Sequence, residues 1–216
     1  MAEPFKNMYN KQFFDLFTKD LRLVIDDFDA HGFVSQIMDD EWEGRELKQR
    51  WIHITSILKK FLPTDYKEAI TKILELLDHV KNTRPDFSVI DDTKFGLMLE
   101  YGVILNNYVE QYGLDDYETS VKAIEKITQF TSCEFVTHPF IIKYPDKMMK
   151  QMLVWSKHGH WGVRRLASEG CRPRLPWAMA LPMKQRHTAK RRIVFFMFLI
   201  FKLLMIGDCV CFPQAA

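Results

Sequence analysis

The stretch PDKMMKQMLVWSKHGHWGVRRLASEG, residues 145–170, carries the clearest structural pattern in this chain of 216 residues. Pro145 is typical of a helix start, because its missing N–H falls where an amide would have no helical partner. Met152 and Trp155 follow at helical spacing, and after a short polar turn residues 163–169 form a second apolar-faced segment. The stretch therefore predicts two short helices that pack against each other.

Helical periodicity continues upstream of this pair. One run steps by four, three, four and three residues and so places five apolar side chains on one helix face: Leu47, Trp51, Ile54, Leu58 and Phe61. No stretch alternates with a period of two for long enough to indicate a strand. We therefore predict an all-α fold, an α-solenoid of HEAT-like repeats in which each helix pair buries its apolar face against its neighbours.

The character of the chain changes after Pro182. Residues 184–216 hold six Lys or Arg against one acid, and the fourteen residues 193–206 are apolar except for Lys202. This run is shorter than the ~20 residues of a membrane-spanning helix, and it lacks the polar outer face of a capping repeat. We predict a HEAT-like repeat domain over 1–183, incomplete at its C-terminal end, and an anomalous tail over 184–216.

Two origins for this tail stay open. A shifted reading frame or a truncated gene would produce such a stretch, and we favour that explanation. The alternative is a tail that associates with membranes, in which case removal of residues 184–216 would abolish recovery with membranes. We expect no stable membrane association.

The composition is that of an ordinary globular protein, with 47% apolar and 27% charged residues and a formal net charge of +2. The positive charge is local, since residues 143–174 hold eight Lys or Arg against Asp146 and Glu169 in an otherwise mildly acidic body. This pattern indicates directed binding to a polyanion.

Nothing at the N-terminus has the form of a signal peptide, and the four cysteines are too scattered for a disulfide framework. Cys209 and Cys211 lack a second pair or a histidine cluster nearby, so we expect no metal. No phosphate-binding glycine loop is present, and we expect no small-molecule cofactor. The sequence favours a monomer in the cytoplasm.

Four arginines lie within eleven residues and are followed by one indole: Arg164, Arg165, Arg172, Arg174 and then Trp177. Gly170 is a natural helix stop, and Pro173 and Pro176 make the following segment stiff and extended. Guanidinium groups held rigidly at such a corner suit a repetitive anion such as a phosphate backbone. Trp177, at the end of the rigid segment, is placed to touch a ligand.

Two acidic residues allow two readings each. Glu134 completes a capping box with Thr131 as N-cap, or it is a functional carboxylate at a helix start. Glu169 forms a helical ion pair with Arg165, or it belongs to a buried network that positions that arginine. The cluster of acids within residues 39–43 is expected to be a solvated loop.

Three motifs resemble the AlkC branch of the HEAT-repeat DNA alkylation-repair glycosylases. The most specific is RRLASEG at 164–170 followed by RPRLPW at 172–177; FTSCEF at 130–135 with HPF at 138–140 and GLDDY at 113–117 also match. The resemblance runs from about residue 10 to Pro182. After Pro182 the family continues with a further repeat and another acidic residue, and the tail stands in their place here.

The resemblance implies a DNA glycosylase of base excision repair that acts on double-stranded alkylated DNA in the cytoplasm, associated with the nucleoid when bound. Its substrates would be cationic N-alkylated bases such as 3-methyladenine, and in this branch 3-methylcytosine. Glu134 would be the catalytic carboxylate, and Glu169 and Trp177 would line the lesion site. The expected backbone contacts are Lys157, Arg164, Arg165, Arg172 and Arg174. The alternative is a HEAT-repeat scaffold that binds DNA or protein without chemistry.

Overall fold

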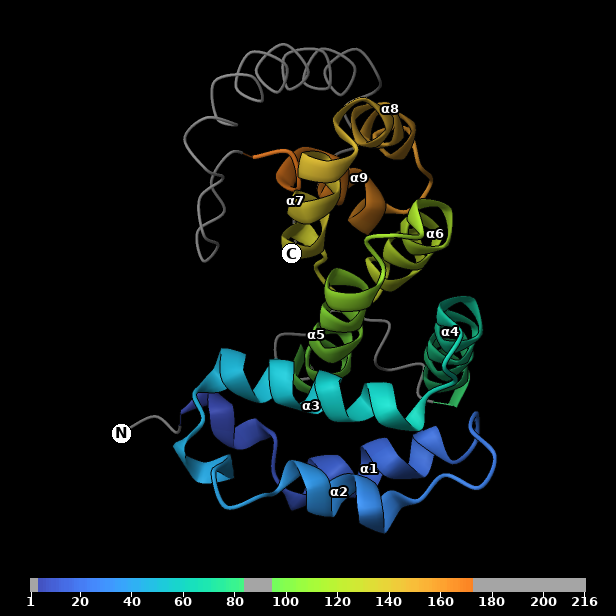
Figure 1. Ribbon diagram of the computed structural model, residues 1–216. Coiled ribbons are helices and arrows are strands. Elements are labelled where there is room, and N and C mark those ends of the chain that lie inside the picture. The colour runs from blue at the N-terminus through green and yellow to red at the C-terminus, as the bar shows by residue number, and fades with distance from the viewer. Residues whose placement is uncertain (1–3, 84–94, 173–216) are drawn as a thin grey trace, which may run out of the picture. The chain divides into compact units, whose positions relative to one another are not determined.

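The computed structural model describes residues 4–83 and 95–172, with side chains described from residue 101 onward in the second range. The chain forms two compact units, Met1–Val136 and Thr137–Ala216. The described residues are helices joined by turns and contain no strand, which confirms the all-α prediction (Figure 1).

The first unit contains two short 3₁₀ helices and six α-helices, and it includes the start of a seventh. Their bounds are η1 Phe5–Met8, α1 Lys11–Leu21, α2 Ala30–Ile37, η2 Trp42–Gly44, α3 Leu47–Phe61, α4 Tyr66–Thr83, α5 Phe95–Tyr112, α6 Tyr117–Ile127 and α7 Glu134–Lys143.

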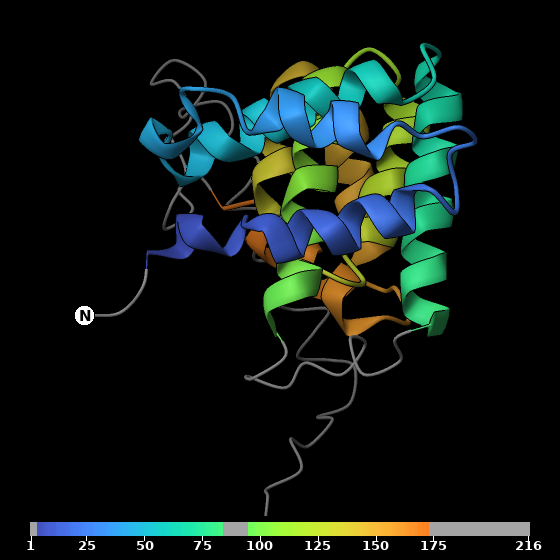
Figure 2. The same cartoon turned by 90° about the horizontal axis from the view of Figure 1, so that it is seen from below.

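The helices of the first unit stack in two layers. In one layer α2 contacts α3 and α3 contacts α5, and in the other α1 contacts α4 and α4 contacts α6. Helices from the two layers also contact each other. Figure 2 shows α1 and α2 side by side, and α5 contacts α6. In a solenoid, each helix pair stacks on the next pair along the chain, which gives two layers of helices such as these. The HEAT-like prediction is therefore confirmed.

Aromatic side chains fill the core at the N-terminal end of the first unit. Phe13, Phe17 and Tyr101 form a cluster in which the rings of Phe17 and Tyr101 are 4.7 Å apart in an edge-to-face arrangement. Burial of each such ring contributes about 1.5–3 kcal/mol to folding. The Asn10 side chain accepts the Phe13 amide at 3.1 Å and so fixes the start of α1. Local capping and core packing therefore agree on the position of this helix.

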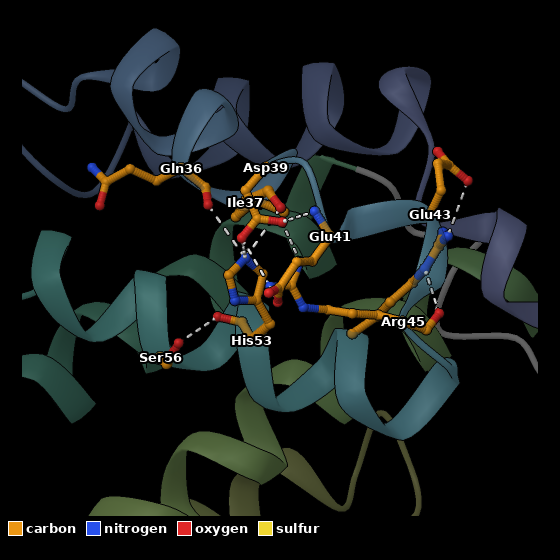
Figure 3. Close-up of polar contacts among 9 residues, drawn as sticks. Gln36, Ile37, Asp39, Glu41, Glu43, Arg45, His53 and Ser56 are labelled. Carbon is orange, nitrogen blue, oxygen red and sulfur yellow. Dashed lines mark hydrogen bonds and ion pairs between the residues drawn. The ribbon is translucent and has the colours of Figure 1, made fainter.

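The acidic cluster between α2 and α3 is solvated, as expected, since Glu41 and Glu43 have 83% and 89% of their side-chain surfaces exposed. It is also ordered by ion pairs. The Asp39 carboxylate accepts from both terminal nitrogens of Arg45, and Glu41 pairs with the same guanidinium at 3.0 Å (Figure 3). The Arg45 guanidinium holds the pKa of Asp39 below its usual range. From α3, the His53 imidazole lies 3.1 Å from the Ile37 carbonyl. The network joins the end of α2 to α3.

Arg50 is a buried cation of the first unit, with 2% of its surface exposed. It donates to the Lys6 carbonyl at 2.9 Å and pairs with Glu43 at 3.4 Å, and its guanidinium lies 4.3 Å from the Trp42 ring centroid. A buried charge is tolerated only when such partners replace its water. Arg50 thereby ties η1 and η2 to α3.

The second unit contains the rest of α7, α8 Pro145–Trp155 and α9 Trp161–Glu169. α8 and α9 lie against each other, as residues 145–170 predicted (Figure 1). α8 buries Met148, Met152 and Trp155, and α9 buries Val163, Leu166 and Ala167. Within the two described ranges, no helix is both long enough and apolar enough to cross a membrane. Arg174, Trp177 and residues 184–216 lie outside the described residues, and the proposed domain boundary at 183 stays a prediction.

Candidate nucleic-acid interface

The turn between α8 and α9 is built around Arg164. One terminal nitrogen of Arg164 donates to the carbonyls of His158 and Gly159, at 2.8 and 2.7 Å. Nδ1 of His158 accepts the His160 amide at 2.9 Å, and Nδ1 of His160 accepts the Gly162 amide at 3.2 Å, which caps α9. Arg164, expected only as a phosphate contact, therefore also holds the turn together.

Exposed cations surround this turn and the end of α9. Lys157 lies in the turn, Arg165 lies on α9, and Arg172 follows that helix, all with exposed side chains. Trp161 opens α9 with 48% of its surface exposed and stacks on His160 with the ring centroids 6.0 Å apart. Exposed guanidinium and ammonium groups beside an exposed indole form a surface suited to a nucleic-acid backbone.

Glu169 pairs with Arg172 across 2.7 Å at the end of α9. The carboxylate is 23% exposed and the guanidinium 44% exposed. The pair is thus close to the surface, where ion pairs contribute about 0.2–1 kcal/mol to stability. Its main effect is to restrict the directions in which the Arg172 side chain points.

The end of α9 approaches α7 closely at Gly170. The Thr137 hydroxyl donates to the Gly170 carbonyl at 3.2 Å, and a Cβ on Gly170 would lie 2.8 Å from the hydroxyl oxygen. Gly170 has a right-handed φ of −64°. The predicted helix stop is therefore confirmed. Gly170 is required there by the close approach of the Thr137 hydroxyl and of the Leu166 carbonyl, each 2.8 Å from the position of a Cβ, and not by a left-handed backbone.

Glu134 lies in the first turn of α7, in the first unit, and is 8% exposed. A carboxylate at this position interacts favourably with the helix dipole. The capping box with Thr131 is wrong, because α7 begins at Glu134 itself and Cys133 precedes it. Among the described residues, the buried Thr131 hydroxyl has no hydrogen-bond partner.

The turn that leads into Glu134 is fastened to α5 by residues that the sequence analysis did not single out. The Cys133 thiol donates to the Asn106 side chain at 2.7 Å, and the Asn106 amide donates to the Ser132 carbonyl at 2.9 Å. Burial, with the nearby Glu134 carboxylate as a smaller cause, raises the pKa of the Cys133 thiol. The signal was present, since two asparagines interrupt the apolar run of α5 at Asn106 and Asn107.

Glu134 thus belongs to the first unit, whereas Lys157, Arg164, Arg165, Glu169 and Arg172 belong to the second. Inside the second unit the structure brings Glu169 and Arg172 together. No group of three or more His, Cys, Asp or Glu side chains in the described part of the chain could hold a metal ion.

Comparison with known proteins places this geometry in context. No protein-family model matches the chain. The uncharacterized protein YhaZ of Bacillus subtilis (strain 168) is 36% identical over 177 residues, which cover 82% of this chain and 45% of YhaZ. The solved structure of the Pseudomonas fluorescens alkylpurine DNA glycosylase AlkC, bound to DNA containing an abasic site analog, matches with a TM-score of 0.76 and 26% identity. The match covers 94% of this chain and 51% of that one. The chain has an AlkC-type fold.

The chain spans about half the length of both proteins, 45% of YhaZ and 51% of AlkC. Glu134 lies on α7, and Arg164, Arg165 and Glu169 lie on α9.

Proposed function

We propose that this chain is a DNA glycosylase that excises cationic N-alkylated bases, 3-methyladenine and also 3-methylcytosine, from double-stranded DNA. The observation that carries the proposal is the AlkC-type fold, which extends over 94% of the chain. The exposed cations around α9 support it, because they supply a surface that attracts a phosphate backbone.

The chemistry needs few protein groups. A base alkylated at a ring nitrogen carries a positive charge, so it can leave the sugar without a general acid. The sugar then develops oxocarbenium character, which a nearby carboxylate stabilises electrostatically while water attacks. We assign this role to Glu134, and we assign contacts with the lesion site to Glu169 and Trp177.

We assign DNA binding to five cationic residues: Lys157, Arg164, Arg165, Arg172 and Arg174. We propose that these residues differ in role. Arg165 and Lys157 present exposed charges to the backbone, whereas Arg164 keeps the carbonyls of His158 and Gly159 turned toward itself. Phosphate contacts of this kind position the protein and carry no sequence information.

The decisive experiment measures release of free methylated bases from alkylated duplex DNA by mass spectrometry. The variant is Glu134→Gln, and Glu68→Gln is the matched control, because Glu68 is an exposed acid in the first turn of α4. Loss of an electrostatic stabiliser lowers the rate by on the order of 10²-fold. We therefore expect release by the wild type and by Glu68→Gln, with release by Glu134→Gln reduced by about that factor.

DNA binding is tested separately, by the dependence of affinity on salt concentration. Removal of one phosphate contact lowers the slope of log K against log salt by about 0.9. We expect this loss for Arg165→Gln and no change for Arg22→Gln, since Arg22 is exposed in the first unit outside the proposed surface. Salt-dependent binding by a folded chain without base release would instead show the non-catalytic scaffold.

A further inference from the structure

Two adjacent residues of α7, Thr137 and His138, hold the end of α9. Both are buried, with 0% and 7% of their surfaces exposed. Thr137 donates to the Gly170 carbonyl at 3.2 Å, at the point where no side chain on Gly170 would fit. His138 hydrogen-bonds to the backbone of Arg172. α7 therefore contacts the chain on both sides of Cys171, which is itself buried.

The role of each imidazole nitrogen of His138 follows from its surroundings. The contact with Arg172 favours the protonated ring, so the ring donates and the Arg172 carbonyl accepts. Nε2 is buried and has no hydrogen-bond partner among the described residues, which leaves Nδ1 as the donor. A buried nitrogen without a hydrogen bond requires an explanation. Here Nε2 is left without a partner because the hydrogen bond made by Nδ1 fixes the orientation of the ring.

We propose that Thr137 and His138 are positioning residues that set the direction in which the chain leaves α9, and so hold Arg172 ready for a phosphate. The inference rests on the proposed DNA-binding function. An arginine whose backbone is already ordered loses less conformational freedom on binding than one on a loose segment. The ion pair with Glu169 restricts the Arg172 side chain, and α7 fixes its main chain.

Two substitutions at His138 separate the contributions of its nitrogens. His138→Asn places an amide donor near the position of Nδ1, whereas His138→Gln places its amide near Nε2. If the bond to Arg172 is what matters, asparagine restores function and glutamine does not. Thr137→Val removes the hydroxyl contact with Gly170, and Thr137→Ser retains it.

Hydrogen exchange in the DNA-free protein reads out the position of the chain without any need for activity. The amides of Gly170 and Arg172 donate to Leu166 and Glu169, at 2.8 and 3.0 Å, and report the end of α9. The Arg164 amide, which donates to His160, reports its start. We expect His138→Gln and Thr137→Val to speed exchange of the Gly170 and Arg172 amides at least tenfold, while exchange of the Arg164 amide stays unchanged. In His138→Asn, we expect all three amides to exchange at the wild-type rate.

Affinity for a duplex with an abasic-site analogue completes the test. We expect about tenfold weaker binding for His138→Gln and wild-type binding for His138→Asn. Wild-type exchange and affinity in His138→Gln would overturn the inference, as would equal damage in both variants or exchange that also speeds up at Arg164. If the wild-type chain bound no DNA, the proposed function would fall, and the exchange comparison would still decide whether α7 holds Arg172.

Discussion

Two explanations of Thr131, an N-cap or a buried hydroxyl without a partner, predict opposite changes in the free energy of unfolding for the substitution Thr131→Val. The Thr131 hydroxyl is buried and has no partner among the described residues. Its side chain is tightly enclosed, because a Cβ on Gly102 would lie 2.1 Å from the Thr131 methyl carbon. Valine keeps this shape and removes the hydroxyl. A buried polar group without a hydrogen bond costs about 1–3 kcal/mol, so we expect Thr131→Val to raise the free energy of unfolding by about 1 kcal/mol.

The matched control is Thr137→Val, because the Thr137 hydroxyl is also buried but donates to Gly170 at 3.2 Å. Here the same change should lower the free energy of unfolding by about 1 kcal/mol. Urea unfolding followed by circular dichroism gives both values, and a stabilisation of 1 kcal/mol corresponds to a rise of about 2–4 °C in Tm. A loss of about 1 kcal/mol in Thr131→Val would show that Thr131 is an N-cap after all, and it would refute the reasoning.

Two further predictions concern buried titratable groups. Burial lowers the pKa of His138 below its usual 6.5, so the unfolded chain binds the proton more readily, and stability should fall as the pH drops below about 6.5. This loss should be smaller in His138→Asn, as urea midpoints at pH 7.5 and 5.5 would show; equal losses in both proteins would contradict it. Burial also raises the pKa of Cys133 and brings that of Cys171 to about 12. Both thiols should therefore resist iodoacetamide at pH 8 in the native protein and react after unfolding, as read by peptide mass spectrometry, and native alkylation of either would contradict their burial.

The helices could be predicted from the sequence because their signals are local. Pro145 and the apolar spacing of Met152 and Trp155 act within one or two turns of the chain. The roles of Arg50 and Gly170 could not be predicted. They depend on partners 44 residues away at Lys6 and 33 residues away at Thr137.

The candidate site shows the same division between local and distant causes. Charge density along the chain located the exposed cations Lys157, Arg165 and Arg172, because a cluster of like charges can only be solvated or paired. The capping box failed because Thr131 lies two residues before Cys133, the residue that precedes α7. The actual support for the Glu134 turn comes from Asn106 on another helix, which no local pattern reveals.

Arg164 and Arg165 are adjacent in the sequence, yet their loss would produce different kinds of defect. Arg164 holds two carbonyls of the α8–α9 turn, so its replacement loosens a piece of structure whose disorder grows with heat. Arg165 contributes an exposed charge, and the effect of losing it depends on the salt that screens it. In a genetic screen, alleles at position 164 would therefore be temperature-sensitive, whereas alleles at position 165 would be sensitive to ionic strength.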